Sequence, residues 1–554
     1  MKCDEVKPVC GPCAKGHRPC VYSASVKVRV SLFRPVIRSA ILPPPPQVRW
    51  DPVRDEPRNY ESHAPAQPSP GTGLSLPPWS TPQEDSTSPR STLSSTPYPA
   101  EIAPLRWLGL LADDAGSVTS IGPSERSHEA DDYNLSLSAA RFSPVRALGV
   151  PGAHDVQTRS RSPYYSSAPI SDPATQAAER RFWQAHIKLR PHEMSMFRHF
   201  VERLSNCLDM YDPLKHFSTF VPQLALNNEG LMKSIMALSA RHLSIKDKSE
   251  STPDRTAAVQ YYYETLQYLQ GAMHYDSFKT SLELLATTII ISSYEMIDGA
   301  GSGWERHLKG TFWIQRSQEI NGQSGGLKQA VWWCWLRQDV WAAFRERRRC
   351  FSFYKPTKPY HVLDQYDIAS RAIYLLAQAV NYASDKDRKL GETNLQSRIE
   401  RADTLFNMLD EWQMNLTPHF TPLPIVDLAP NGPFKPIWIN PPCFATAVQM
   451  HYFARILLLV HQPAAGGYRE YLLRDKSLNE AIDTIGGLAT AITCESASLH
   501  SSQCLFAAGL YTQDLQKREK IVELIKANQF RTGWPSTTDL TEELRQEWSK
   551  SGPP

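Results

Sequence analysis

The sequence predicts a mainly α-helical protein made of three parts. Four of its ten cysteines fall within the first twenty residues, which indicates a small N-terminal cysteine-rich module. A long stretch rich in proline and serine follows, which predicts a disordered linker. From about residue 179 onward, apolar residues recur at helical spacing with little β-type alternation, which predicts a large all-α domain.

Charge is unevenly placed along the 554 residues, a length that exceeds one ordinary hydrophobic core. The formal net charge is +3, but residues 1–50 hold nine basic and two acidic side chains. The remainder is therefore slightly acidic, and the basic end predicts contact with a polyanion. No apolar run of signal-peptide length follows Met1, and the best apolar stretch, 281–297, contains Glu283 and Glu295. We expect neither secretion nor a membrane span, and a reducing compartment that leaves cysteines as thiols or metal thiolates.

The N-terminal cysteines have the spacing C-x6-C-x2-C-x6-C, formed by Cys3, Cys10, Cys13 and Cys20. Thiolates bind zinc tetrahedrally, and the Gly-Pro between Cys10 and Cys13 suits the tight turn that brings two sulfurs to one ion. An isolated C-x2-C pair is as readily a pair of surface thiols or a redox motif. The flanking cysteines, and the absence of a strand–helix pattern around the pair, favour metal.

The first 22 residues resemble the second portion of the fungal Zn2Cys6 binuclear cluster of transcription factors. The resemblance is carried by Lys2-Cys3-Asp4, by Pro8-Val9-Cys10-Gly-Pro-Cys13 and by Cys20-Val21-Tyr22. These segments match the third to sixth cysteines of the family pattern, and the first two are missing. In the family six thiolates hold two Zn2+ ions, and the resemblance implies a bridging role for Cys10. The chain as written is expected to hold one Zn2+ at most, through its four cysteines.

The resemblance also implies DNA as a partner, with CGG-type half-sites in promoters. In the family a basic helix between the first and third cysteines reads the bases, and only Lys2 and Cys3 remain of it here. Lys2, Lys15, His17 and Arg18 are the expected DNA-binding residues, through phosphate contacts that are independent of sequence. Direct base readout needs an element that reaches base edges, and that element is largely absent.

Two explanations of the incomplete cluster compete. Met1 is an internal methionine mistaken for the start, or the protein is a natural remnant of a longer one. We favour the first, because the surviving half keeps the full ligand spacing of a zinc site. That explanation expects further cysteines about five and about eight residues upstream of Met1 in frame.

Residues 23–178 are expected to be a disordered linker with a basic beginning. Four consecutive prolines, Pro43–Pro46, introduce a stretch that carries too little apolar surface to offset the entropy of ordering. Within it, the segment 106–116 (RWLGLLADDAG) mixes Trp, Leu and two Asp. It is either a small activation element or a transient hydrophobic patch.

Residues 179–550 are expected to form the helical domain. Leu231, Ile235, Leu238 and His242 repeat along one helical face, and the segment 443–460 is apolar nearly all round, as in a buried helix. The interval 416–442 holds eight prolines and is expected to be loop.

This domain resembles the fungal-specific transcription factor domain that lies downstream of zinc clusters. The resemblance is carried by segments spread over most of residues 180–510, namely 258–273, 283–310, 331–344 and 451–463. Its most telling part is the run 304–310 (WERHLKG) followed by a Trp-rich helix carrying Arg337, Gln338 and Asp339.

We expect no enzymatic activity. His307 is the most tempting general base, but a histidine beside Trp304 on a helix is more often structural. The basic run 345–349 is a nuclear-import signal, a phosphate contact or a solvated helix end. Nucleophile-elbow, zinc-protease and P-loop motifs are absent from the sequence.

The resemblance implies a nuclear transcription regulator, pathway-specific for a biosynthetic or nutrient gene cluster. Its expected partners are DNA, a second copy of the chain, and the transcription machinery or its co-regulators. The alternative is a regulator without sequence-specific DNA binding of its own, acting through protein partners of its helical domain. The target genes, the half-site spacing, the effector and the direction of control do not follow from the sequence.

Overall fold

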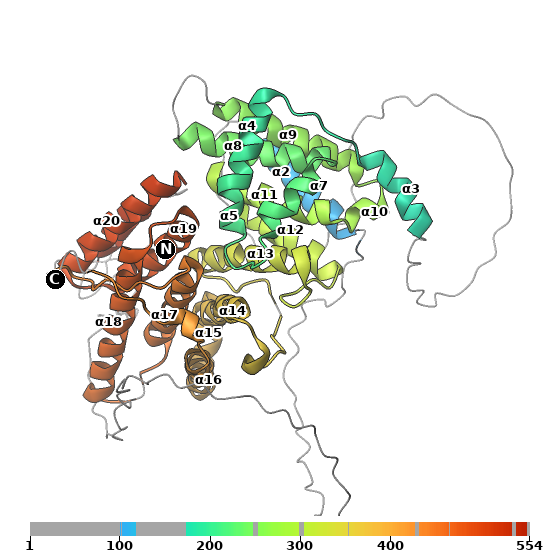
Figure 1. Ribbon diagram of the computed structural model, residues 1–554. Helices are drawn as coiled ribbons and strands as arrows, with labels where there is room; N and C mark the ends of the chain where they lie inside the picture. The colour runs from blue at the N-terminus through green and yellow to red at the C-terminus, as the bar shows by residue number, and fades with distance from the viewer. Residues whose placement is uncertain are drawn as a thin grey trace, which may run out of the picture. The chain divides into compact units, whose positions relative to one another are not determined.

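The computed structural model consists of packed helices joined by short loops (Figure 1). It describes residues 100, 102–117, 173–246, 253–298, 304–352, 354–426, 431–464, 466–534 and 539–550. Over these residues the β-type pairing is a single antiparallel bridge between Leu423 and Trp438. The predicted mainly α fold is therefore confirmed for the described part of the chain. The cysteine-rich module and most of the linker lie outside the described residues.

The helices are numbered in chain order as in Figure 1. They are α2 (Ile102–Ser117), α3 (Pro173–Trp183), α4 (Pro191–His199), the π-helix η1 (Phe200–Leu204), α5 (Ser205–Leu208), α6 (His216–Thr219), α7 (Val221–Ala225), α8 (Glu229–Lys246), α9 (Arg255–Ala272), α10 (Asp276–Lys279), α11 (Leu282–Asp298), α12 (Trp304–Ser317), α13 (Gly326–Glu346), the 3-10 helix η2 (Tyr360–Val362), α14 (Gln365–Ala383), α15 (Asp385–Thr393), α16 (Leu395–Met414), the 3-10 helix η3 (Pro418–Phe420), α17 (Pro442–His461), α18 (Tyr468–Ala491), α19 (Glu495–Tyr511), α20 (Leu515–Thr532) and α21 (Leu540–Lys550). The larger compact unit comprises residues 97–463 and 477–554 and contains most of the helices. The other comprises residues 1–96 and 464–476, of which the described part includes the first turns of α18.

The first half of the larger unit is a layer of helices in which α8 packs between α9 and α11. Leu231, Ile235 and Leu238 of α8 are almost completely buried, and so is His242, which confirms the predicted face. Helix α9 begins where the Asp254 carboxylate accepts a hydrogen bond from an amide of the first turn. Helix α11 packs in turn on α12 and on α13.

The second half continues the same stacking from α13 through α14, α17 and α19 to α20. Helix α17 is the predicted buried helix: by length and composition it passes as a membrane span, but 83% of its most apolar window is buried inside the protein. The proline-rich interval before it is loop apart from the 3-10 turn η3, as expected over its described residues. These two segments confirm the sequence predictions for this half.

Helix α13 joins the two halves, because it contacts α11 and α12 on one side and α14 on the other. Every residue from Ala330 to Val340 is buried, so the helix is enclosed on all sides. It begins after Gly325 and ends at Arg347, whose φ of 54° is left-handed and stops the helix. The fold is therefore organised around one helix whose middle, residues 330–340, is enclosed.

Three consecutive polar residues lie in the middle of this enclosed helix, and each faces a different neighbour. Arg337 reaches the carboxyl end of α5 and also α19. Gln338 is paired with α11, accepting a hydrogen bond from Ser292 Oγ at 2.6 Å and donating one to Ser293 Oγ at 3.2 Å. Asp339 accepts from Arg348 Nη1 at 2.9 Å and from the Phe351 amide at 2.8 Å, which fixes the loop after α13. Since buried polar groups are tolerated when they are hydrogen-bonded, these pairs define how the neighbours dock.

The structure also places helices where the sequence predicted a linker. Helix α2 lies inside the stretch 23–178, and its residues Ala103, Trp107 and Leu111 have no exposed surface. Helix α3 begins at Pro173, before the expected start of the helical domain at residue 179. Within the expected linker, residues 102–117 are therefore helical, and the apolar stripe of residues 103–111 is covered by the helical domain.

Removing the Asp339 carboxylate should destabilise the protein strongly. Asp339→Ala leaves Arg348 and the Phe351 amide without their buried acceptor, and breaking a buried pair of this kind lowers the free energy of unfolding by about 3–5 kcal/mol. Urea unfolding followed by circular dichroism measures the change. The control is Arg388→Ala, because the Arg388–Asp385 pair is about half exposed on both sides and should contribute about 0–1 kcal/mol. Equal effects of the two substitutions would contradict the organising role of α13.

Candidate functional site

The predicted metal and DNA-binding residues lie outside the described part of the chain. This applies to the metal ligands Cys3, Cys10, Cys13 and Cys20 and to the DNA-binding residues Lys2, Lys15, His17 and Arg18. Four closely spaced thiols are a donor set that suits Zn2+. Because these residues are not among those described, the zinc site stays a prediction. In the described residues no group of three or more His, Cys, Asp or Glu side chains is placed to hold a metal ion, and the six cysteines there are free thiols.

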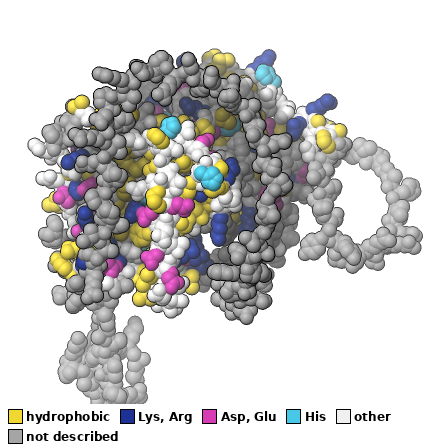
Figure 2. Space-filling view, turned by 60° about the horizontal axis from the view of Figure 1, so that its bottom comes forward, with side chains coloured by type: hydrophobic (Ala, Val, Ile, Leu, Met, Phe, Trp, Pro, Cys, Tyr) yellow, Lys and Arg dark blue, Asp and Glu magenta, His cyan; other side chains and the backbone are white. Residues whose placement is uncertain are grey.

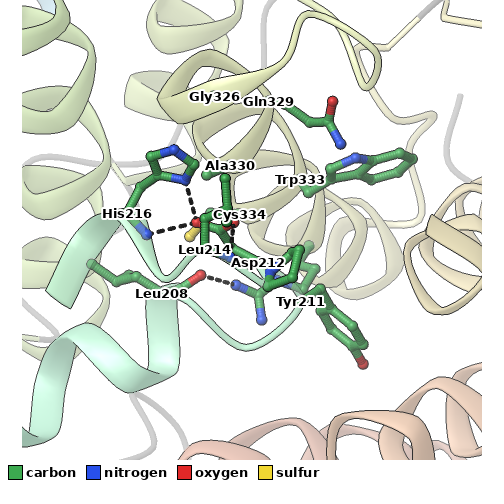
Figure 3. Close-up of a pocket in the computed structure, with 12 residues that line it drawn as sticks. Leu208, Tyr211, Asp212, Leu214, His216, Gly326, Gln329, Ala330, Trp333 and Cys334 are labelled. Atoms are coloured by element: carbon green, nitrogen blue, oxygen red, sulfur yellow. Dashed lines mark hydrogen bonds and ion pairs between the residues drawn. The ribbon is translucent and has the colours of Figure 1, made fainter. Parts of the chain in front are cut away.

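Within the helical domain, a cavity of about 110 Å3 lies between α13 and the loop that follows α5. Figure 3 shows His216 and Trp333 on opposite sides of this cavity, with Asp212 between them. The wall formed by α13 includes Trp333 and Arg337, which are four residues apart and so share a helix face. The cavity therefore brings the enclosed helix α13 to the edge of a polar loop.

Two aspartates shape this loop. The Asp209 carboxylate accepts hydrogen bonds from the amides of Phe217 and Ser218 at 2.7 and 2.8 Å, which holds the start of α6 against the end of α5. Burial raises the pKa of Asp209 to about 6, although these amide bonds act in the opposite direction. Asp212 accepts from both the amide and Nδ1 of His216, at 2.7 and 2.6 Å. Local side-chain contacts of this kind favour the turn over continued helix.

Arg337 is the main charged group of the wall, and its exposed fraction is only 6%. Its Nη2 donates to the backbone carbonyls of Cys207 and Leu208, at 3.2 and 3.0 Å, at the carboxyl end of α5. A cation is favourable there because the last carbonyls of a helix carry partial negative charge. The guanidinium also lies 5.3 Å from the Tyr211 ring centroid, within the range of a cation–π contact.

The second partner of Arg337 fixes the state of a histidine. Arg337 Nη1 lies 3.0 Å from His500 Nε2. Because arginine is always a donor, Nε2 must accept, and the ring proton resides on Nδ1, which lies 3.4 Å from Gln503 Oε1. Burial, reinforced by Arg337, lowers the pKa of His500 to about 3. His500 is therefore neutral and serves as a hydrogen-bond acceptor for the buried cation.

The cavity has polar groups but lacks the arrangement of an activated nucleophile. Burial raises the pKa of the Cys334 thiol, so this cysteine is protonated at neutral pH and poorly nucleophilic. Two N–H groups of lining residues, Nε of Arg337 and Nε1 of Trp333, are buried without a hydrogen-bond partner. A cavity of this volume has room for water molecules, which can satisfy such donors. The cavity therefore combines unpartnered polar donors with a protonated, weakly nucleophilic thiol.

The two catalytic or basic candidates from the sequence have structural roles. His307 is 4% exposed; its Nδ1 lies 2.6 Å from Glu295 Oε2 and its Nε2 lies 3.4 Å from the Leu110 carbonyl, so it joins α11, α12 and α2. In the basic run, Arg345 pairs with Glu543 at 2.7 Å, Arg348 with Asp339 and Arg349 with Asp387. These three arginines form ion pairs within the domain, which differs from the nuclear-import signal, the phosphate contact and the solvated helix end named above.

The role of Arg337 was missed at the sequence level, although its position carried a signal. Three adjacent polar residues inside a Trp-rich helix are incompatible with a helix that is simply apolar, and each then needs a partner. The partners named above for Arg337 and Gln338 are 45 to 163 residues away in the chain, so the pattern alone could not name them. Only the partners of Asp339 are close in sequence, at 9 and 12 residues.

Figure 2 shows one face of the molecule, on which the described Lys and Arg side chains are mixed with Asp and Glu. The described part of this face therefore does not indicate a single basic patch for phosphate contact.

Acidification should destabilise the protein through its buried histidines. Burial lowers the pKa of His199 and His461 to about 4 and of His451 and His500 to about 3, against an ordinary value of 6.5. As the pH falls below about 6.5 the unfolded chain takes up protons that the folded chain does not, so the free energy of unfolding decreases. Each such histidine contributes a slope of up to about 1.4 kcal/mol per pH unit between about pH 6 and pH 4.

The variant His500→Gln isolates one of these slopes. Glutamine keeps an acceptor for Arg337 and does not titrate, so urea unfolding at several pH values should give a shallower dependence by about 1 kcal/mol per pH unit. The matched control is His192→Gln, which makes the same exchange at an exposed position away from the Arg337 contact. A pH dependence that is identical in His500→Gln and the unmodified protein would refute a neutral His500.

Comparison with known proteins shows what part of this helical region resembles. Residues 195–335, which run from α4 into α13, match the model of the fungal specific transcription factor domain. The chain is also similar to the transcription activator AMTR1 of Alternaria alternata, at 22% identity over 347 residues. This alignment covers 49% of the chain and 44% of the relative, so the chain spans less than half the length of the curated relative that it matches. No solved structure matches the chain. Over residues 195–335 the helical domain is thus similar to the fungal specific transcription factor domain.

Proposed function

We propose that the protein is a nuclear, pathway-specific regulator of transcription in a fungus. The observation that carries the proposal is the match of residues 195–335 to the fungal specific transcription factor domain. The similarity to a protein named as a transcription activator supports it. The enclosed helix α13, whose first half completes the matched region, gives this domain a rigid frame on which ligands or co-regulators can act.

The proposed contact with DNA is assigned to the N-terminal residues. Nine basic against two acidic side chains in residues 1–50 make this the positively charged part of a nearly neutral chain. In the proposal Cys3, Cys10, Cys13 and Cys20 hold a Zn2+ ion, and Lys2, Lys15, His17 and Arg18 contact phosphates. Zinc would supply a structural centre that folds the loop, since four thiolates form a closed tetrahedral site.

The test measures zinc content and DNA binding on the same protein. We expect about one Zn2+ per chain by plasma mass spectrometry, from four thiolates in one tetrahedral site, and its loss in Cys10→Ser. The control is Cys494→Ser, which alters a free thiol of the helical domain and should leave the zinc content unchanged.

DNA binding is then measured on the unmodified protein and on the same two variants, Cys10→Ser and Cys494→Ser. With three permanently charged contacts, from Lys2, Lys15 and Arg18, the affinity for duplex DNA should fall roughly 40-fold between about 50 and about 200 mM salt. Zinc without DNA binding would contradict the DNA-binding role and favour a regulator that acts through protein partners. An unchanged zinc content in Cys10→Ser would contradict the metal assignment.

A further inference from the structure

Helix α2 is anchored to the helical domain by a single stripe of side chains. Ala103, Trp107 and Leu111, spaced four residues apart, have no exposed surface, whereas Ile102 and Leu105 on the other side are 43% and 48% exposed. The stripe packs on α12 and reaches α9. The helix thus has one docked face and one free face, as an amphipathic helix bound in a groove does.

The centre of the docked face is a close approach between Trp107 and Gly310 of α12. A Cβ atom added at Gly310 would lie 2.6 Å from Trp107 Cδ1, and 3.1 and 3.2 Å from Cβ and Cα of Trp107. The backbone of α2 therefore comes as close to α12 as a glycine allows. Only a residue without a side chain at position 310 lets the tryptophan reach full burial.

Polar groups complete the groove around this anchor. His307 Nε2 lies 3.4 Å from the Leu110 carbonyl, and His307 is held in place by Glu295 at 2.6 Å. Tyr262 of α9 donates to the other oxygen of Glu295 at 2.9 Å. The groove is therefore preorganised by contacts among α9, α11 and α12 that do not involve α2.

The sequence of α2 combines large apolar residues with acidic ones. Its sequence places Trp107, Leu110 and Leu111 next to Asp113 and Asp114. Acidic residues interspersed with large apolar ones are typical of activation segments that fold when they bind a partner. A lone helix of this length is marginal in water, so α2 depends on the surface that covers it.

We propose that α2 is a masked activation segment. The helical domain holds it in the docked state, and its release exposes Trp107 and Leu111 to a co-regulator whose apolar groove is bordered by basic residues. The proposal rests on the proposed role in transcription. Because α2 is covalently tethered, the helical domain competes with the co-regulator for α2 at a high effective concentration. A moderate change in the affinity of α2 for the helical domain therefore shifts the docked population.

The variant Gly310→Ala tests the docking from the side of the domain. Alanine favours helix over glycine, so α12 itself is preserved while the approach of Trp107 is blocked. Hydrogen exchange of the full chain, read by mass spectrometry, should show at least ten-fold faster exchange for residues 102–111 and unchanged exchange for residues 330–340. The matched control is Gly271→Ala on α9, where an added Cβ meets nothing within 4 Å.

The variant Trp107→Ala tests the docking from the side of the segment, and it leaves every residue of the groove intact. It should release residues 102–111 to the same extent. If residues 102–111 exchange as slowly in both variants as in the unmodified chain, the docking is overturned. This measurement needs no DNA, so it stands apart from the test of the proposed DNA contact.

Reporter transcription then separates masking from simple packing. The full chain is fused to a heterologous DNA-binding domain, so that its own DNA binding does not limit the readout. Gly310→Ala should raise reporter output several-fold, because the released segment keeps its aromatic anchor. Trp107→Ala should not raise it, because the same release leaves the segment without that anchor. Release in Gly310→Ala without a rise in output, or an equal rise in both variants, would overturn the masking role.

Discussion

The fold depends on keeping three adjacent polar side chains satisfied inside an enclosed helix. Arg337, Gln338 and Asp339 point from α13 toward three different neighbours, and each finds partners with good geometry. An unpaired polar group at Gln338 or Asp339 would carry the full desolvation penalty, whereas the Nε of Arg337, which has no protein partner, lines the cavity where water can satisfy it. The hydrophobic effect accounts for the compactness of the domain, whereas these pairs determine which helix docks on which side of α13.

The need to pair buried polar groups also explains why so many charged and titratable groups in the domain have structural roles. The buried cation of Arg337 is balanced by helix-end carbonyls and a neutral histidine, and none of these hydrogen-bond partners is a carboxylate. His242 Nε2 meets the Thr532 carbonyl at 2.8 Å, and its Nδ1 meets His199 Nε2 at 2.9 Å, so these rings also serve as connectors. Burial that lowers histidine pKa values and raises that of Cys334 keeps such groups neutral, which suits connection better than proton transfer.

Much of the helical domain could be predicted because periodicity is a local property. The stripe Leu231–Ile235–Leu238–His242 and the buried helix after Pro442 follow directly from residue order. The partners of Arg337 and the Arg345–Glu543 ion pair could not be predicted, because they join residues far apart in the chain. Helix α2 was predicted to be disordered since composition was averaged over a long stretch, whereas its burial depends on three residues and one glycine on α12. The cysteine cluster and its basic neighbours rest on sequence alone.

Helix α12 shows how a releasable segment can coexist with a rigid domain. One side of α12 presents Gly310 to Trp107, and two residues earlier the Leu308 carbonyl accepts a hydrogen bond from Trp335 Nε1 of α13 at 2.9 Å. Phe312 of α12 also stacks on the Trp335 ring, with 5.4 Å between ring centroids. These contacts tie α12 to the enclosed helix without involving α2, so the proposed release of α2 leaves them intact. The stability of the domain and the occupancy of the groove are therefore separable, which is the physical requirement for an element that is released without unfolding what holds it.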